Sequence, residues 1–445
     1  MPEHAPGRPD PFLVVGETDW RGEHHRFGMY ARDRLRHAWL IGKTGTGKST
    51  LLANLIRQDL AAGEGLAVLD PHGDLIDAVL PFVPRERTND VLLFAPEDRA
   101  FPVSFNVFRA GRRAHADHAL LTSQLISLFR KQWADSWGPR LEHVLRNAIL
   151  AVAPDPRATL LFLYRFLTDA DLRERVVSRV EDPVVRQFWE REFASYGRTL
   201  QGEALAPALN KLGAFVTNPV IRNIVAQERS RVDLSRLVDG RGILLAKLPV
   251  GAIGEDAAHL LGGLLLTGIQ LAAMARRRAD PPFWVYVDEF HNFTNGSLAT
   301  LLSESRKFGL GLVLAHQYLE QLPDAVRAAV LGNIGTILCF RIGSADAAEL
   351  EAEFAPELAA GDLERLPRYH LAVRLLADGE TLRPFSARTL APRSAPPWGP
   401  HQAEHVHQQS RDRHALPRAH VEALIRRGFA GTASAAPVDG DDRSG

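Results

Sequence analysis

The sequence predicts an α/β fold organised around a mainly parallel sheet. Short apolar runs of strand length alternate along the chain with segments whose apolar residues recur at helical spacing, which is typical of a parallel sheet covered on both faces. A glycine-rich stretch at residues 42–49 lies where one such strand gives way to a helix, as in phosphate-binding loops. The expected strands span residues 38–41, 65–69, 90–94, 242–248, 283–287, 309–315, 335–341 and 369–376.

Two departures from this alternation divide the chain. Residues 1–35 form an expected N-terminal β segment, in which residues 12–15 and 25–30 predict a small hairpin. Between residues 112 and 222 the strand patterns vanish and helical patterns follow one another, which predicts an inserted all-α domain. The surrounding α/β domain then consists of residues 36–111 and 223–392.

The C-terminal residues 393–445 are rich in Pro, His, Gln and Ala, and we expect them to be largely disordered. Only residues 417–429 have a helical pattern. The tail contains His401, His405 and His407, but no second cluster of ligands completes a metal site, so we expect these histidines to be solvated.

Composition narrows the class of protein. Of the 445 residues, 45% are hydrophobic and 24% are charged, which is ordinary for a soluble globular protein and unlike a disordered chain. The formal net charge is zero, so any contact with nucleic acid must come from a local patch or an assembled channel. The single cysteine, Cys339, allows no intramolecular disulfide, and residues 1–11 show no signal peptide. We therefore expect a cytoplasmic protein.

One segment approaches the length of a membrane span. Residues 257–275 contain no charged side chain and approach the ~20 residues that a spanning helix needs. The segment nevertheless includes glycines and polar side chains such as His259 and Gln270, and a strand pattern follows almost at once. We expect a helix buried against the sheet.

The glycine-rich stretch has the full G-x-x-x-x-G-K-[ST] pattern. Its glycines allow a tight turn that aims backbone N–H groups at a phosphate, and the N-terminus of the following helix adds its positive end. Lys48 would reach the outer phosphates, and the hydroxyl of Ser49 would hold Mg²⁺. The predicted phosphate-binding residues are Gly42, Thr44, Gly45, Thr46, Gly47, Lys48, Ser49 and Thr50.

A phosphate loop needs a carboxylate partner for the metal. The apolar run at residues 283–287 is followed by Asp288 and Glu289, so Asp288 is the candidate Mg²⁺ ligand and Glu289 the candidate base that takes a proton from water. The alternative is an acidic pair that begins a helix. A base on water indicates a hydrolase rather than an enzyme that transfers phosphate to a metabolite.

Three further side chains complete the candidate site. Gln317 follows the strand at 309–315, on the edge of the sheet where ligands bind, and is placed to sense a γ-phosphate or orient water. Arg306 either caps its own helix or reaches the nucleotide of a neighbouring subunit as an arginine finger. Asp70 either faces the nucleotide or, with Asp74, caps the next helix.

The inserted domain offers a weaker signal. It carries a small excess of positive charge, which fits a solvated face as well as a contact with DNA. Aromatic side chains within it are able to stack on bases, but we expect most of them to pack in the core. These side chains are Trp133, Trp137, Trp189 and Tyr196.

Taken together, these segments resemble the conjugative-transfer coupling-protein ATPases of type IV secretion (TraG/TraD-like), within the HerA/FtsK superfamily of P-loop DNA-translocating ATPases. The resemblance covers roughly residues 12–390, and the stretch from Glu304 to Gln317, ESRKFGLGLVLAHQ, is its most particular part. It also rests on residues 42–49, 68–76, 137–150, 210–225 and 285–293.

The resemblance implies a RecA-like P-loop NTPase fold, ATP and Mg²⁺ as cofactors, and a hexameric ring with ATP between subunits and DNA threaded through it. By motif position, Arg306 is the expected finger in trans and Gln317 the sensor. Membrane-anchored members begin with spanning helices, which we do not expect here. Two alternatives follow: a soluble relative that works in DNA processing, repair, mobile-element transfer or defence, or a protein that docks on a separately encoded partner at the inner face of the membrane.

Two functions remain open at this point. The first is an ATP-driven DNA translocase of the coupling-protein type. The second is a nucleotide-gated module that regulates assembly with a partner without moving DNA, which the zero net charge favours. A P-loop kinase for a small molecule is a third reading, and it has no use for an arginine donated by a neighbour.

Overall fold

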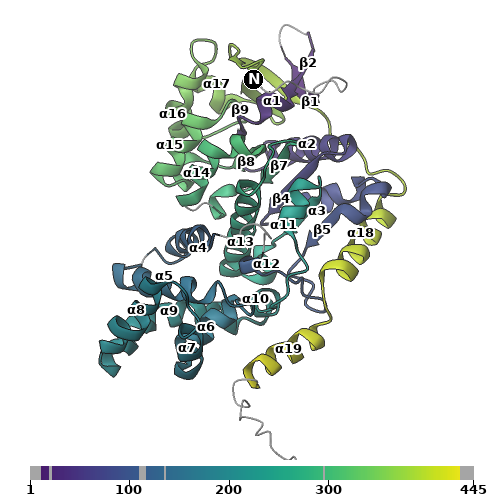
Figure 1. The fold of residues 1–445 in the computed structure, drawn as a ribbon. Coiled ribbons are helices and arrows are strands. Elements are labelled where there is room, and N and C mark those ends of the chain that lie inside the picture. Colours follow the sequence, from purple (N-terminus) through teal and green to yellow (C-terminus); the bar gives the residue numbers. More distant parts are fainter. Residues whose placement is uncertain (1–11, 20–22, 110–116, 135–136, 294–295, 431–445) are drawn as a thin grey trace, which may run out of the picture.

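The computed structural model describes residues 12–19, 23–109, 117–134, 137–293 and 296–430. Its centre is an eleven-stranded sheet with the order β2-β1-β13-β10-β9-β3-β8-β7-β4-β6-β5 (Figure 1). The strands of this sheet are β1 (Phe12–Thr18), β2 (Arg26–Tyr30), β3 (Ala38–Ile41), β4 (Gly65–Asp70), β5 (Val91–Phe94), β6 (Ile243–Lys247), β7 (Phe283–Val287), β8 (Leu310–His316), β9 (Thr336–Cys339), β10 (His370–Arg374) and β13 (Phe385–Thr389).

The middle of the sheet is parallel. Every pairing from β9 through β3, β8, β7, β4 and β6 to β5 is parallel, which confirms the predicted mainly parallel α/β fold. Strand β8 lies between β3, which precedes the phosphate loop, and β7, which precedes Asp288. The three segments predicted to build the site therefore leave three adjacent strands at the same edge of the sheet.

The other side of the sheet is antiparallel and differs from our expectation. The predicted hairpin of β1 and β2 forms, but β1 joins the sheet through β13, a strand that we did not predict. The sequence of β13, Phe385 to Thr389, is short and directly follows Pro384, so its apolar pattern is too brief to indicate a strand. A two-stranded ribbon of β11 (Leu376–Ala377) and β12 (Glu380–Thr381) lies beside it in the chain.

Helices cover both faces of the sheet. One face packs on α2 (Lys48–Ala62) and α3 (Asp74–Val79), whose Leu51, Leu55 and Ile76 are fully buried. The other face packs on α13 (Glu255–Met274). The remaining helices of the α/β part are α1 (Ala31–Arg34), α11 (Leu234–Asp239), α12 (Val250–Ile253), α14 (Gly296–Glu304), α15 (Asp324–Asn333), α16 (Ser344–Phe354) and α17 (Ala360–Arg365).

Helix α13 is the apolar segment weighed above as a membrane span. It is the one helix in the described residues that is long and apolar enough to cross a membrane, and 89% of its most apolar window is buried inside the protein. Gly262 and Gly263 let Phe293 and Leu128 approach its backbone closely. The expectation of a buried core helix is confirmed.

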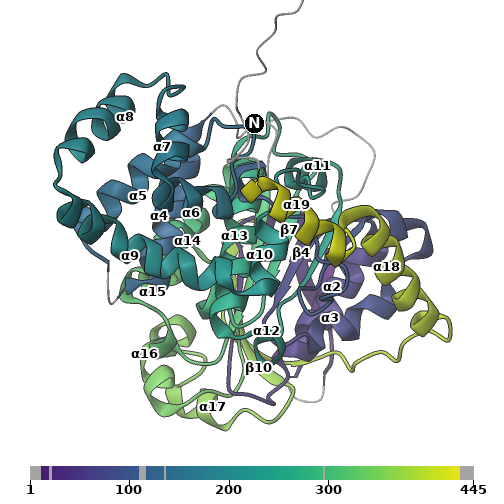
Figure 2. The same cartoon turned by 90° about the horizontal axis from the view of Figure 1, so that it is seen from below.

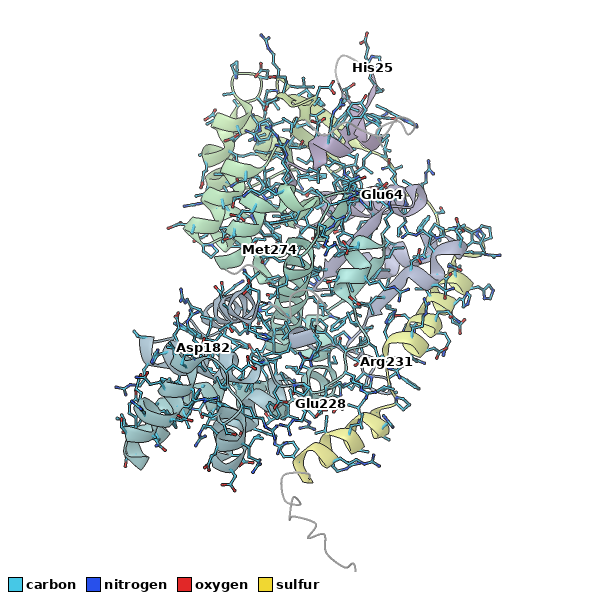
Figure 3. All side chains as sticks on the ribbon, viewed as in Figure 1. His25, Glu64, Asp182, Glu228, Arg231 and Met274 are labelled. Carbon is cyan, nitrogen blue, oxygen red and sulfur yellow. The ribbon has the colours of Figure 1, made fainter. Side chains whose placement is uncertain are left out.

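A helical lobe follows β5, beginning with α4 (His118–Gln132), which packs on both α13 and α5. In Figure 2 the lobe lies on one side of β4 and β7, and α2 and α3 lie on the other. Asp182, which caps α8, is labelled within the lobe in Figure 3, far from His25 at the top of the view. Its other helices are α5 (Pro139–Val152), α6 (Leu160–Thr168), α7 (Ala170–Val177), α8 (Pro183–Gln187), α9 (Arg198–Thr217) and α10 (Pro219–Val225).

Aromatic packing holds the lobe together. Trp133 is buried and stacks on Phe129, with ring centroids 4.6 Å apart, and on Phe215 at 5.9 Å. Trp189 is also buried, whereas Trp137 and Tyr196 are only partly buried. Core packing is therefore the role of the two buried tryptophans, as predicted.

The C-terminal segment is more ordered than we predicted. The expected helix is present as α19 (Arg418–Ala430), but a second helix, α18 (Gly399–His414), precedes it and packs along β5. The buried side chains of α18, Gln402, Val406 and Ser410, recur every four residues, but two of the three are polar, so the sequence shows no apolar helical period. His401 and His405 are exposed, and residues 431–445 lie outside the described part of the chain.

Candidate nucleotide site

The phosphate loop runs from the end of β3 into the first turn of α2. Gly45 and Gly47 have φ values of 74° and 127°, which side-chain-bearing residues rarely adopt. A Cβ on Gly47 would also lie 3.0 Å from the rings of Phe340 and Tyr369. These glycines allow the loop to turn tightly, and the helix that begins at Lys48 presents its N-terminal N–H groups beside it.

Neighbouring strands hold this loop in place. The Lys43 N–H donates to the carbonyl of Arg341 at 2.9 Å, and the Tyr369 N–H donates to the carbonyl of Thr46 at 2.8 Å. The Thr46 hydroxyl donates to the Lys43 carbonyl at 2.7 Å. Sequence reasoning missed Arg341 and Tyr369, because these contacts come from the ends of remote strands and no local motif marks them.

Lys48 lies across the loop that it belongs to. Its ammonium group donates to the carbonyls of Gly42 and, at 3.3 Å, Lys43. Burial lowers the pKa of Lys48, while the nearby carboxylates of Glu289 and Asp288 favour its charged form. Lys48 is thus a buried cation between the phosphate loop and the acidic end of β7. An anionic ligand bound there would compete with the loop carbonyls for its ammonium group.

The acidic pair sits where β7 ends. The Asp288 N–H donates to the Leu69 carbonyl at 3.0 Å, and one carboxylate oxygen of Asp288 accepts the Glu289 N–H at 3.0 Å. Both side chains are buried. Burial, with the charges of Glu289 and Asp70 added, raises the pKa of Asp288 to about 7. A cation here would relieve the repulsion between Asp288 and the neighbouring carboxylates of Glu289 and Asp70. The Asp288 carboxylate and the Ser49 hydroxyl are hard oxygen donors of the kind that Mg²⁺ prefers.

Gln317 connects the phosphate loop to the acidic pair. Its amide N–H donates to Glu289 Oε1 at 2.9 Å, and its carbonyl oxygen accepts the hydroxyl of Thr44 at 3.0 Å. Glu289 itself has a left-handed backbone, with φ 44° and ψ 51°, which is uncommon for a non-glycine residue and typical of functional sites. The structure therefore brings together three of the predicted site segments.

Asp70 has a structural role that the sequence left open. One of its carboxylate oxygens accepts the His72 N–H at 2.9 Å, and the other accepts the N–H groups of Leu75 and Ile76 at 2.9 and 3.1 Å. Asp70 therefore caps α3 and holds the turn before it. Asp74 is exposed.

Arg306 does not join this cluster. It lies on a 3₁₀ turn, Ser305–Phe308, that precedes β8, whereas Gln317 follows β8. Seven residues of strand separate the two positions, which is about 23 Å at ~3.3 Å per residue. Arg306 is exposed, and its guanidinium makes no hydrogen bond or ion pair with any described residue. It stands in the last turn of this helical segment, where a cation is favoured, so the helix-end alternative stays open.

The turn that carries Arg306 is nevertheless firmly fixed. His37 accepts the Leu312 N–H at 3.1 Å through Nδ1, and its Nε2 lies 3.1 Å from the Leu302 carbonyl and 3.3 Å from the Ser305 hydroxyl. Arg276 donates to the carbonyl of Phe308 at 2.9 Å. A rigid backbone thus presents an unengaged cation to solvent.

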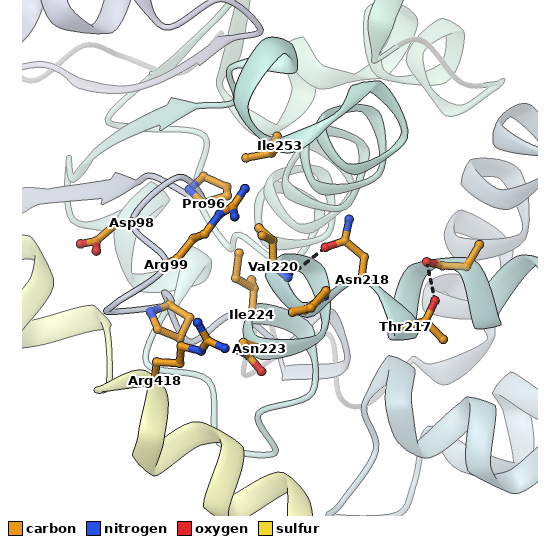
Figure 4. Close-up of a pocket in the computed structure, with 13 residues that line it drawn as sticks. Pro96, Asp98, Arg99, Thr217, Asn218, Val220, Asn223, Ile224, Ile253 and Arg418 are labelled. Atoms are coloured by element: carbon orange, nitrogen blue, oxygen red, sulfur yellow. Dashed lines mark hydrogen bonds between the residues drawn. The ribbon is translucent and has the colours of Figure 1, made fainter.

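A separate cavity of about 550 Å³ lies away from the phosphate loop, where the α/β part, the helical lobe and α19 meet (Figure 4). Arg99 on one wall donates to the Ala252 carbonyl at 3.3 Å, and Asn218 caps α10 through the Val220 N–H. The Arg418 N–H donates to the Ala100 carbonyl at 2.9 Å. The cavity marks a junction between three parts of the fold rather than a part of the nucleotide site.

Comparison with known proteins agrees with this architecture. Residues 25–214 match the family model described as the type IV secretion-system coupling protein DNA-binding domain. The type 4 coupling protein DotL of Legionella pneumophila is 22% identical over 413 residues, with 76% of this chain and 51% of DotL covered. The chain thus spans about half the length of that relative.

Solved structures show the same fold. The unbound conjugative coupling protein TrwBΔN70 has a TM-score of 0.61 and 16% identity, with 87% of this chain and 97% of that chain covered. TrwB in complex with ADP and Mg²⁺ has a TM-score of 0.60 and 17% identity, over 88% of this chain and 99% of that chain. The fold is RecA-like, and the family match together with these relatives confirms the resemblance to type IV coupling proteins that the motifs predicted.

Proposed function

We propose that this chain is an ATPase that uses Mg²⁺·ATP to move DNA, and that it works as a ring, by expectation a hexamer, with ATP bound between subunits. The observation that carries the proposal is the position of Arg306 on a fixed turn, exposed and at the opposite end of β8 from the chain's own phosphate loop. A cation presented in this way is out of reach of its own nucleotide and is available to the nucleotide of another copy.

The other half of such a site is formed by the phosphate loop. The N–H groups of residues 42–50 and the Lys48 ammonium would bind the phosphates. Ser49 and Asp288 would hold Mg²⁺, which when bound neutralises charge on the outer phosphates. The TrwB complexes with ADP and Mg²⁺ and with a non-hydrolysable ATP analogue support this choice of ligands.

Glu289 and Gln317 would carry the chemistry. Glu289 is a buried carboxylate that would accept a proton from the attacking water. Gln317 hydrogen bonds both Glu289 and Thr44, so it is placed to orient that water and to respond to the γ-phosphate. Arg306 of the adjoining copy would stabilise the charge that develops on the transferred phosphoryl group.

DNA is the proposed cargo because the matched family model describes a DNA-binding domain and covers the phosphate loop together with most of the helical lobe. A secretion or membrane partner encoded elsewhere would give the motor its place in the cell. The chain's zero net charge favours the second candidate, a nucleotide-gated module that assembles with a partner and moves nothing.

One experiment separates the two. The ATP turnover of the purified oligomer is measured alone, with single-stranded DNA and with double-stranded DNA, and Lys48→Ala serves as the inactive control. We expect at least one form of DNA to increase turnover, and micrographs with an ATP analogue and DNA to show a ring around the strand. Turnover that neither form of DNA changes would contradict the motor and leave the gated module.

A further inference from the structure

The loop that follows Asp288 and Glu289 is in contact with the helical lobe. Lys131, in the last turn of α4, donates from its Nζ to the carbonyl of His291 at 2.8 Å. Lys131 is partly buried, and this burial lowers its pKa to about 8. The lobe and the loop after β7 therefore share a direct hydrogen bond.

The side chain of the same His291 faces the catalytic candidates. Its Nδ1 lies 3.4 Å from Glu289 Oε2, and its Nε2 lies 3.3 Å from the amide nitrogen of Gln321. Burial lowers the pKa of His291 to about 4, so the ring is neutral at pH 7. A Gln321 N–H donated to Nε2 leaves the ring proton on Nδ1, the nitrogen nearer to Glu289.

Gln321 provides a second route to the site. Its carbonyl oxygen accepts the backbone N–H of Gln317 at 3.3 Å. A displacement of His291 would therefore change its contact with Glu289 directly and would displace Gln317 through Gln321. Both routes end on the two groups that would handle the attacking water.

The loop has little freedom to absorb such a shift. Phe290 packs edge-on against the buried ring of His316, with centroids 4.9 Å apart. Phe293 packs so closely on α13 that a Cβ on Gly262 would lie 2.3 Å from its ring. Residues 290–293 are held at both ends, and displacement at one end is passed on to the other.

The end of α4 is equally rigid on the lobe side. Trp133, two residues after Lys131, is buried and stacks on Phe129 and Phe215. Lys131 therefore moves with the core of the lobe rather than as a loose surface side chain. The neighbouring Gln132, in the same turn, donates to Asp256 of α13 at 3.3 Å, and this contact is not connected to the nucleotide site.

We propose that Lys131 and His291 are positioning residues that couple the helical lobe to the nucleotide site. DNA bound to the lobe would change the positions of Glu289 and Gln317, and a bound nucleotide would in turn change the conformation of the lobe. The proposal rests on the proposed function for the identity of the nucleotide. It concerns the path of coupling, and by reciprocity binding at the lobe and binding of the nucleotide must change each other's affinity by the same factor.

The test uses the full chain with Lys131→Met, which keeps the length of the side chain and removes its donor, and Lys131→Arg, which restores a donor. Gln132→Met is the matched control, because it breaks a lobe contact from the same helical turn. Basal kcat and KM, DNA-stimulated kcat and hydrogen exchange of α4 with and without an ATP analogue are measured for each variant, together with thermal unfolding as a check on folding.

We expect Lys131→Met to lower the ratio of DNA-stimulated to basal kcat by at least about fivefold and to abolish the nucleotide-dependent change of exchange in α4. Lys131→Arg should restore both responses, and Gln132→Met should leave both intact. Lys131→Met responding like the wild type, or Gln132→Met behaving like Lys131→Met, would overturn the proposal. If DNA stimulates no variant, the proposed motor fails, and the exchange measurement still decides the coupling.

Discussion

Gln317 donates its side-chain N–H to Glu289 Oε1 at 2.9 Å while it accepts the hydroxyl of Thr44 from the phosphate loop at 3.0 Å. This one amide joins the turn that would bind phosphate to the carboxylate that would activate water. A hydrogen bond to a charged group is worth about 1.5–3 kcal/mol. Gln317→Leu should therefore lower kcat by about 10- to 100-fold in steady-state ATP hydrolysis. A variant that raises only KM would show that Gln317 binds nucleotide without orienting water.

Replacement of Glu289 separates binding from hydrolysis. Glu289→Gln keeps the size of the side chain and its bond to Gln317 but removes the base, so kcat should fall by about 10²- to 10⁴-fold while the Kd for ATP, measured with a fluorescent analogue, stays within a few-fold. A DNA-moving function must disappear with hydrolysis. A gated module would keep its assembly with a partner in this variant.

The trans role of Arg306 is tested by mixing inactive subunits. Arg306→Ala retains a complete phosphate loop, and Lys48→Ala retains a complete finger, so each homogeneous oligomer should be inactive and a mixture should recover part of the ATPase activity. Lys307→Ala is the control, since Lys307 is an exposed neighbour 4.0 Å from Glu304, and it should behave like the wild type. Mixtures with no more activity than their components would count against a shared site.

A buried ion pair beneath the sheet should dominate local stability. The Arg34 guanidinium donates to both carboxylate oxygens of Asp59, at 2.8 and 2.6 Å, and stacks 3.7 Å from the Trp284 ring centroid. Both charged side chains are 2% exposed. Asp59→Asn leaves the Arg34 charge unpaired and should lower the free energy of unfolding by about 3–5 kcal/mol, measured by urea denaturation. The Tyr286 hydroxyl hydrogen bonds both partners, so the apolar set Arg34→Met, Asp59→Leu and Tyr286→Phe should recover much of this loss, and no recovery would contradict the explanation.

Glu142 gives the lobe a defined pH response. The indole N–H of Trp137 and the guanidinium groups of Arg146 and Arg130 bind its carboxylate, and together they hold its pKa at about 2, against burial that acts in the opposite direction. Because the folded pKa is depressed, the stabilisation is complete above the ordinary pKa of 4.5 and is lost as the pH falls toward 2.

Glu142→Gln should therefore lower the Tm at pH 7, and its difference from the wild type should shrink between pH 4.5 and 2 in a series of thermal melts. A Tm difference that stays constant over this range would show that the carboxylate charge does not stabilise the lobe.

Local patterns predicted much of the fold and of the candidate site. The phosphate loop, Asp288 with Glu289, and Gln317 each follow a buried strand, so the strand pattern alone brings them to one edge of the sheet. What the sequence did not predict depends on pairing between remote segments. Strand β13 lies between β1 and β10 and pairs with both, which its own short sequence does not reveal. Helix α18 is too polar to show an apolar helical period.

In the candidate site, too, the contacts that the sequence did not predict join segments that are remote along the chain. The N–H of Tyr369 that holds the loop at Thr46 and the Lys131 to His291 bond come from elements more than 100 residues away from their partners. Neither contact leaves a pattern along the chain. The sequence left two roles possible for Asp70, because a carboxylate that follows a strand suits either a bound ligand or a helix cap. The role as a cap is seen only in the structure, where Asp70 accepts three backbone N–H groups.

The phosphate loop and Arg306 lie at opposite ends of the parallel neighbours β3 and β8. In a dimer with a two-fold axis the loop of each copy would meet the arginine of the other, and both ends of these strands would have to lie in one self-complementary patch. If copies instead meet head to tail, as in the proposed ring, each contact leaves one unmatched loop and one unmatched arginine at the extremes of the assembly. Growth therefore stops only when the last copy meets the first, and if the rotation per copy fails to close, the same contact produces an open filament.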